Sequence, residues 1–368
     1  MIKVLTALAC TCAAMAFTGT AGATVRFGVN ESAGKGADRG IGFFGTLNNI
    51  GLTENAVTLS WNAAAPQQIV GKPDLDLWMP QAAIRGIRVV LVVSPARPKD
   101  LTSAPDNAAK FASFLQLVAR TYPQVKDFVV GNEPNQPKFW QPQFDENGQN
   151  VSGAAYEQVL AQSYDALKAF DPKINVIGLG LSARGNDMPN APSNISTSPI
   201  RFLYYLGKAY RASGRTKPLM DELAFHPYPN VNTDAPLKGY QWPNAGIPNL
   251  DRVKQVIWDA FNGTGQPVFA ESGLRQAHPL KLDLDETGWQ VGIPPNLAVL
   301  YHGKENVPVI DESTQAQYYG DIVRYIVCDP DVVSLSFYHL IDESDLDRWQ
   351  SGLLRLDGSR RPPATRPR

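Results

Sequence analysis

Cysteine and histidine are scarce in this chain of 368 residues, which has three of the first and four of the second. Cys10 and Cys12 lie in a leader segment, so only Cys328 remains for the folded part. No internal disulfide can form, and stability must come from a large hydrophobic core. We interpret Cys328 as a small buried hydrophobic residue. No histidine has a partner at a spacing typical of zinc ligands, so neither a metal nor a cofactor is predicted.

Surplus charge is also missing, because 34 lysines and arginines face 35 aspartates and glutamates, for a net charge of −1. Proteins that bind nucleic acid electrostatically need a basic face, and this balance gives no sign of one. Beyond residue 23 the sequence has no hydrophobic run long enough to span a bilayer. We therefore expect neither nucleic-acid binding nor membrane insertion.

The first 23 residues have the pattern of a secretory signal peptide, with Lys3, a short apolar run and small residues ending in AGA. We expect a mature chain that begins at Thr24 and is secreted, to the periplasm or the extracellular space. A lipoprotein anchored at Cys10 is the alternative. It fits less well because Ala7 stands where a bulky aliphatic residue is expected.

Strand-like runs alternate with helical patterns along the whole chain, and the central strands are continuous apolar runs, as in parallel sheets covered on both faces. The expected strands are 25–30, 56–61, 87–95, 125–135, 174–182, 220–229, a segment between 267 and 289, and 332–340. Eight alternations predict an α/β protein with a single-domain (β/α)8 TIM barrel over residues 24–358. An open doubly wound sheet is the alternative, but no G-x-G-x-x-G follows the first strand and no P-loop occurs.

The loops after strands 4 to 7 are long and rich in Pro, Asn and Gly, and they would stand over the C-terminal face of the barrel. They carry aromatic residues that could bind sugar rings or pack the loops together. After strand 8 little room is left for a helix, so we expect the eighth helix to be reduced or missing. Residues 359–368 are expected to form a basic tail.

Carboxylates stand at predicted strand ends. Glu133 ends strand 4 in GNEPN, and Glu271 and Glu286 compete for the end of strand 7. On strand 6, alternation places His226 and Tyr228 on one face, which should be the barrel interior. Hydrolysis of a glycoside needs two carboxyl groups astride the bond, one as acid and one as nucleophile or base. The pattern therefore indicates a glycosidase site.

These motifs resemble the clan of retaining (β/α)8 glycosidases that includes glycoside hydrolase families 5 and 39. The resemblance rests on GNEPN, HPY, ETGW and FYHLIDESDLDRWQSGLLRLDG. It implies Glu133 as acid/base, Asn132 as a ligand of the sugar 2-hydroxyl, His226 and Tyr228 as residues lining the site, and a strand-7 glutamate as nucleophile. The clan's strand-8 tryptophan is absent, and FYH stands at 337–339 instead.

The two candidate nucleophiles differ in their surroundings. Glu271 follows QPVFA, which has the better strand propensity. Glu286 ends KLDLDE, where strict alternation places the leucines at 280, 282 and 284 and the glutamate on one face. It also leaves about 25 residues before the next helix instead of about 40, and long loops without structure are uncommon. We therefore expect Glu286 to be the nucleophile.

The sequence thus predicts a secreted, retaining glycoside hydrolase that acts on a carbohydrate without a cofactor. A transglycosylase with the same residues and a non-catalytic carbohydrate-binding barrel are the alternatives. The indole of Trp289, in ETGW, is either a sugar platform or a loop anchor. The predicted site comprises the catalytic Glu133 and Glu286 and the substrate-binding Asn132, His226, Tyr228 and Trp289.

Overall fold

The computed structural model describes residues 25–32, 38–270 and 278–361. Eight parallel strands close into one barrel in chain order, and β8 pairs with β1. This confirms the predicted (β/α)8 fold. The strands are Arg26–Asn30 (β1), Glu54–Trp61 (β2), Arg88–Pro95 (β3), Asp127–Val130 (β4), Asn175–Ser182 (β5), Glu222–His226 (β6), Lys281–Thr287 (β7) and Val332–Phe337 (β8).

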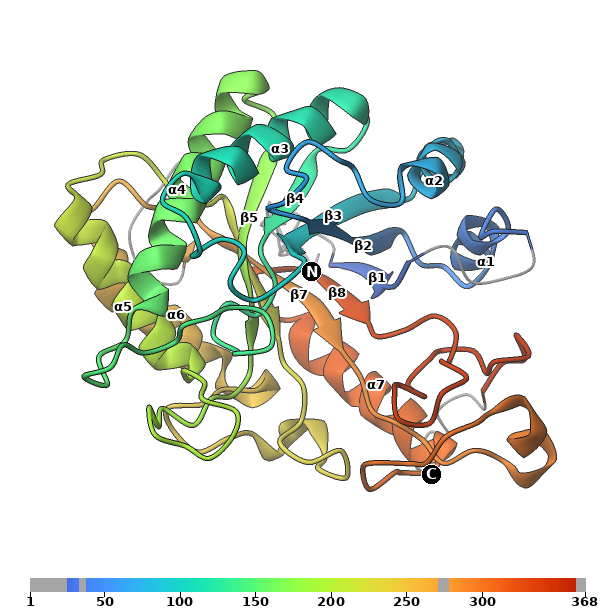
Figure 1. Cartoon of the computed structure of the whole chain (residues 1–368). Helices are drawn as coiled ribbons and strands as arrows, with labels where there is room; N and C mark the ends of the chain where they lie inside the picture. Colours follow the sequence, from blue (N-terminus) through green and yellow to red (C-terminus); the bar gives the residue numbers. More distant parts are fainter. Residues whose placement is uncertain (1–24, 33–37, 271–277, 362–368) are drawn as a thin grey trace, which may run out of the picture.

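Helices surround the barrel and follow the first seven strands (Figure 1). They are Phe43–Asn49 (α1), Lys72–Ile84 (α2), Asn107–Thr121 (α3), Ser152–Phe170 (α4), Pro199–Ser213 (α5), Leu250–Phe261 (α6) and Glu312–Ile326 (α7). From residue 338 to residue 361, all of which are described, the chain forms turns and bridges and no helix. The expected loss of the eighth helix is therefore confirmed. Arg361 at the end of this segment pairs with Asp342 and Glu312 at 2.6 and 3.3 Å.

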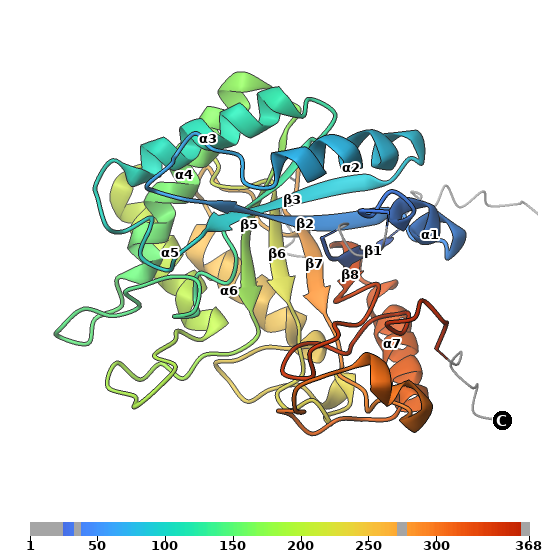
Figure 2. The same ribbon diagram turned by 45° about the vertical axis from the view of Figure 1, so that its right-hand side comes forward.

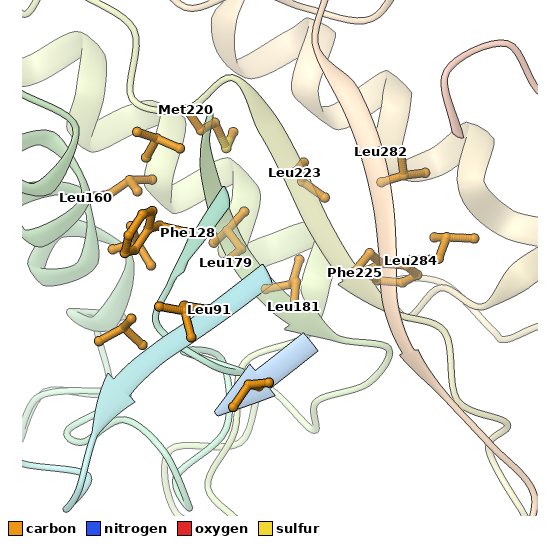
Figure 3. Packing of buried hydrophobic residues seen from close by; sticks show 14 of the residues in the cluster. Leu91, Phe128, Leu160, Leu179, Leu181, Met220, Leu223, Phe225, Leu282 and Leu284 are labelled. Carbon is orange, nitrogen blue, oxygen red and sulfur yellow. The ribbon is translucent and has the colours of Figure 1, made fainter. Parts of the chain in front are cut away.

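The apolar residues of the strands fall into two layers because successive side chains point to opposite faces. Leu91, Phe128, Leu223, Phe225 and their equivalents pack outward against the helices in one large cluster (Figure 3). A second, separate cluster fills the barrel interior with small and branched side chains: Ala56, Val90, Val92, Val129, Ile177 and Ala224. The helices match this outer layer. In α6 the buried residues recur every three or four positions, and burial of each large apolar side chain stabilises the fold by about 1.5–3 kcal/mol.

The strands β5, β6 and β7 point toward the lower edge of Figure 2, where the long loops gather. This is the C-terminal face on which barrel enzymes carry their sites. Cys328 lies in the turn that follows the C-terminal end of α7, and its thiol is free and exposed. The prediction that it is buried is wrong. Within the described residues, no helix has the length and apolar character that crossing a membrane requires.

Candidate active site

Glu133 lies directly beyond β4, which ends at Val130 and not at residue 135 as predicted. The strand stops because Gly131 and Glu133 have positive φ angles of 93° and 40°, which a strand does not tolerate. A Cβ atom on Gly131 would come within 3.2 Å of the Tyr156 ring. The Tyr156 hydroxyl donates to the Val130 carbonyl and accepts from the Leu179 N–H at 2.7 Å. Helix α4 thereby fixes the turn that presents Glu133.

A bulge in β5 holds the other side of this turn. Between Gly178 and Leu181, β5 has one residue more than β6. The extra length aims the Gly180 carbonyl at the Glu133 N–H, which donates to it at 2.8 Å. A Cβ atom at Gly180 would lie 3.2 Å from Nε2 of His226, so the glycine lets the imidazole approach the β5 backbone.

His226 and Tyr228 lie together at the end of β6, as alternation predicts. His226 is the last residue of the strand and is fully buried. Tyr228 follows beyond the strand and is partly exposed. Its hydroxyl donates to Oε1 of Glu286 at 2.7 Å. The end of β6 therefore supplies both a buried ring and a hydrogen-bond donor to the site.

Glu286 lies in the site, but the alternation argument that favoured it is wrong. Leu282 and Leu284 face the helices in the outer cluster (Figure 3). Asp285 faces the interior, where it lies 3.2 Å from His226. Continued alternation would turn Glu286 outward. Instead, β7 has one residue more than β8 between the pairs Leu284–Leu335 and Thr287–Phe337. This bulge brings Asp285 and Glu286 to the same side of the strand.

The His226 ring is the centre of the site. Its Nδ1 lies 3.1 Å from Oε1 of Glu133 and 3.6 Å from Oε2 of Glu286, and its Nε2 lies 3.2 Å from Oδ1 of Asp285. Burial lowers the pKa of His226, but the Asp285 and Glu286 carboxylates raise it more, so the net shift is well above the usual value. The raised pKa favours the imidazolium form, in which Nδ1–H donates to Oε1 of Glu133, whereas Nε2 and Asp285 lie 3.2 Å apart without the geometry of a hydrogen bond.

The surroundings of Glu286 raise its pKa. Burial raises its pKa to about 7, the His226 imidazolium opposes this rise, and the Glu133 carboxylate adds to it. The Asn30 side-chain amide donates to Oε2 at 3.4 Å, on the side opposite the Tyr228 hydroxyl. Glu286 therefore holds its proton below about pH 7 and is ionised above it.

A cleft of about 830 Å³ opens above these groups. Asn132, predicted to bind substrate, lines it together with Glu133, Tyr228 and Glu286. The remaining lining is rich in amides and aromatic rings, and it includes Asn30, Gln136, Phe139, Asn194, Asn230, Asn232, Tyr240, Gln290, Tyr338 and Trp349. Such a surface offers hydrogen bonds to hydroxyl groups and flat faces to sugar rings.

Three residues close to His226, Tyr228 and Glu286 were not singled out from the sequence. Asn30 ends β1, Asp285 directly precedes Glu286, and Trp349 lies in the segment after β8. The Trp349 ring packs on Tyr228 and Tyr338, with centroid separations of 4.9 and 5.4 Å. It places a tryptophan beside Tyr228, which contacts Glu286, although strand 8 has none. The pair DE in DLDET was the one available signal, for Asp285.

Trp289 does not line the active-site cleft, and the prediction that it binds substrate is corrected. The residue is fully buried, and its ring packs on Tyr318 and Tyr319 of α7 at 5.7 and 6.2 Å. Its Nε1–H donates to the Asp234 carbonyl at 2.9 Å. The side chain therefore anchors the loop after β6 to α7, which is the alternative that the sequence left open.

The competing nucleophile Glu271 and the predicted leader 1–23 lie outside the described residues. β7 itself is formed by the later segment, which Phe269 joins through a bridge to Leu280. Across the described ranges, no three or more His, Cys, Asp or Glu side chains are grouped so that they could hold a metal ion.

No protein-family model matches the chain, and no curated protein matches it in sequence. Among solved structures it is similar to a family 39 glycoside hydrolase from the gut symbiont Bacteroides cellulosilyticus WH2, with a TM-score of 0.60 and 18% identity. The match covers 91% of this chain and 61% of that one. The chain thus spans less than two thirds of this relative's length.

Two further structures show the same likeness. A monomeric beta-xylosidase from Caulobacter crescentus CB15 matches with a TM-score of 0.53 and 16% identity, over 92% of this chain and 66% of that one. A Rhizomucor miehei beta-1,3-glucanosyltransferase mutant in complex with laminaritriose matches with a TM-score of 0.52 and 15% identity, over 92% and 97%. At these identities the comparisons establish the shared barrel, so the resemblance inferred from the sequence is confirmed for the fold.

Proposed function

We propose that this protein is a retaining glycoside hydrolase that cleaves an O-glycosidic bond in an oligo- or polysaccharide. The observation that carries the proposal is the pair of carboxyl groups at one imidazole nitrogen. Since their oxygens lie 3.1 and 3.6 Å from Nδ1 of His226, they are at most 6.7 Å apart. Retaining glycosidases place these groups about 5–5.5 Å apart and inverting ones about 6.5–9.5 Å apart, so an upper limit of 6.7 Å reaches only the lowest part of the inverting range and favours retention.

Glu286 is the nucleophile in this mechanism. Hydrogen bonds from Tyr228 and Asn30 favour its ionised form, which a nucleophile needs. The Glu286 carboxylate attacks the anomeric carbon, the bond to the leaving oxygen breaks, and Glu133 donates its proton to that oxygen. Water then attacks the glycosyl-enzyme, gives a proton to Glu133 and releases Glu286. Asn132 binds the sugar hydroxyl beside the reacting carbon.

Transfer to a sugar acceptor in place of water uses the same residues. The structural similarity to a glucanosyltransferase is consistent with this alternative. Product analysis separates the two activities, because a transglycosylase yields products longer than its substrate. We further propose that the chain is exported after cleavage before Thr24, and N-terminal sequencing of exported material tests this.

The decisive experiment replaces each candidate nucleophile separately. Glu286→Gly and Glu271→Gly are assayed on an activated aryl glycoside with and without azide. Azide should restore turnover in Glu286→Gly alone and give a glycosyl azide of inverted configuration. Rescue of Glu271→Gly, with near-normal activity of Glu286→Gly, would contradict the assignment. Inversion of the wild-type product, followed by NMR, would refute the retaining mechanism.

A further inference from the structure

One wall of the cleft is built by the loops that follow β4 and β5. Lys138 lies on the first loop and Arg184 on the second, and both line the cleft. The loops are joined beneath them. The Gln136 side-chain amide donates to the Arg184 carbonyl, and Asn135 exchanges hydrogen bonds with the Ser182 backbone at 3.0 and 3.2 Å. The two cations are therefore presented by one connected wall.

The charges of the cleft are unevenly distributed. Apart from the two glutamates, Lys138 and Arg184 are the charged side chains among the described residues that line it. Neither lies within ion-pair distance of a described carboxylate, although the whole chain has 35 acidic residues for 34 basic ones. One guanidinium N–H of Arg184 donates to the Asn230 carbonyl at 2.7 Å, and the Lys138 ammonium lies over the Phe139 ring. Both cations remain exposed and available to a ligand.

An anionic substrate would need such a wall. The floor of the cleft carries Glu133 and Glu286, which repel a second negative group at short range. Two cations without carboxylate partners offset this repulsion, and a guanidinium binds carboxylate and sulfate oxygens with well-directed N–H groups. A site for neutral sugars alone would have no electrostatic need for them.

We propose that this wall binds a carboxylate or sulfate group of an acidic glycan, which is the substrate class of the cleft. The inference rests on the proposed glycosidase function for the same site. The shared chemistry is an anionic substituent on a sugar that lies on the Glu133 side of the cleft, because Glu133, Lys138 and Arg184 belong to adjoining segments.

The test measures binding, which needs no turnover. Affinity electrophoresis compares glucuronoxylan and polygalacturonate with their carboxyl-reduced forms, and carrageenan with desulfated carrageenan. At least one acidic member should bind about fivefold or more tightly than its neutral partner, the gain expected of a partly solvated ion pair. The first two pairs identify a carboxylate and the third identifies a sulfate.

Variants assign this preference to the wall. Lys138→Gln and Arg184→Gln should each reduce it about fivefold, and Arg184→Lys should retain part of it. Lys208→Gln, which removes an exposed cation of α5 outside the cleft, is the matched control and should change nothing. Equal binding of acidic and neutral partners, or an equal loss in the control, would overturn the proposal.

Turnover assays distinguish a failure of the acidic-substrate proposal from a failure of the glycosidase proposal. Hydrolysis of aryl glycosides without any preference for acidic glycans would overturn the acidic-substrate proposal and leave the glycosidase intact. Wall-dependent binding of an acidic glycan by a protein that cleaves no glycoside would support the wall and refute the enzyme.

Discussion

The barrel holds a cation surrounded by carboxyl groups at each end of its interior. At the N-terminal ends of the strands, Arg88 pairs with Glu54, lies 2.6 Å from Asp127, and lies 3.7 and 3.9 Å from Glu222 and Asp283. At the C-terminal ends the imidazole of His226 faces three carboxylates. The apolar interior cluster separates the two groups.

The two cations differ in whether they can lose their proton. The surrounding carboxylates raise the pKa of Arg88 against the effect of burial, so its charge is permanent. At the other end the charge is held on a titratable imidazole, beneath an open cleft. The comparison teaches that one fold uses buried carboxylates in two ways. A permanent cation holds strand ends together at one end, and a titratable cation lies beside the carboxyl groups of the cleft at the other.

Arg88→Met should have the largest effect, and on stability. It leaves the buried Asp283 without its cation and the buried Glu54 with only the more exposed Arg26, which costs about 3–5 kcal/mol in the free energy of unfolding. Burial already raises the pKa of Asp283 well above its usual value. A carboxyl with a raised folded pKa loses stability as pH rises, so the deficit should be larger at pH 8 than at pH 5. Urea unfolding at both pH values measures it.

The matched control is Arg26→Met, because Arg26 contacts the same Glu54 at 3.3 Å but is far more exposed. It should cost no more than about 1 kcal/mol. The folded fraction of Arg88→Met should keep a kcat within about twofold of the wild type. A large fall in the kcat of Arg88→Met without a fall in its stability would contradict a purely structural role for the N-terminal end of the barrel interior.

The pH dependence of kcat/KM should report the titration of the carboxyl groups at the C-terminal end of the barrel. Since burial raises the pKa of Glu286 to about 7, this carboxyl is protonated below that pH and ionised above it. A protonated carboxyl cannot attack the anomeric carbon. We expect kcat/KM to fall about tenfold per pH unit below pH 7. An aryl glycoside with a good leaving group should show the same fall, because Glu286 attacks both substrates, and a fall confined to the natural substrate would contradict Glu286 as the titrating group.

Asp285→Asn should show how far the charge of His226 controls the pKa of Glu286. Without this carboxylate the pKa of His226 falls, since Asp285 is the strongest influence that raises it. For Glu286, the loss of the imidazolium outweighs the loss of the weaker Asp285 charge, so its pKa should rise. Glu286 then stays protonated to a higher pH. We expect the acidic limb to move up by about one pH unit, which lowers kcat/KM about tenfold at pH 6.

Asp283→Asn is the control for this variant, because Asp283 points to the same interior but faces Arg88. It should leave the position of the acidic limb unchanged. If both variants moved the limb alike, the shift would reflect general interior charge and not the contact with His226.

The sequence predicted the strands and the residues that gather at the site, and it failed where the backbone departs from regular geometry. Strand β3 was expected at 87–95 and β5 at 174–182, close to their observed bounds, because apolar runs mark buried strands. Helix α1 was not predicted, since its seven residues are too few for a clear helical period. The bulges in β5 and β7 have no signal in a regular alternation, although they orient the Glu133 turn and Glu286.

Contacts between residues far apart in the chain could not be predicted from the sequence either. The contact of Asp285 with His226 joins two strands through a side chain that alternation alone would not rank as functional. Trp349 lies in an irregular segment, so no period places it beside Tyr228. The catalytic roles of Glu133 and Glu286 remain predictions, which the azide experiment tests.

The smallest expected effect distinguishes two tryptophans at the catalytic end. Trp349→Leu removes a partly exposed ring that packs on Tyr228, the hydrogen-bond donor to Glu286. An aromatic contact of this kind contributes about 0.5–1.5 kcal/mol, so kcat/KM should fall about fivefold with little loss of stability. Trp289→Leu should do the reverse, because its buried ring anchors a loop and truncation leaves a cavity. Thermal unfolding and kcat/KM of both variants decide the matter. If Trp289→Leu lowered kcat/KM at unchanged stability, the result would contradict the role of Trp289 as a loop anchor and support a contact with substrate.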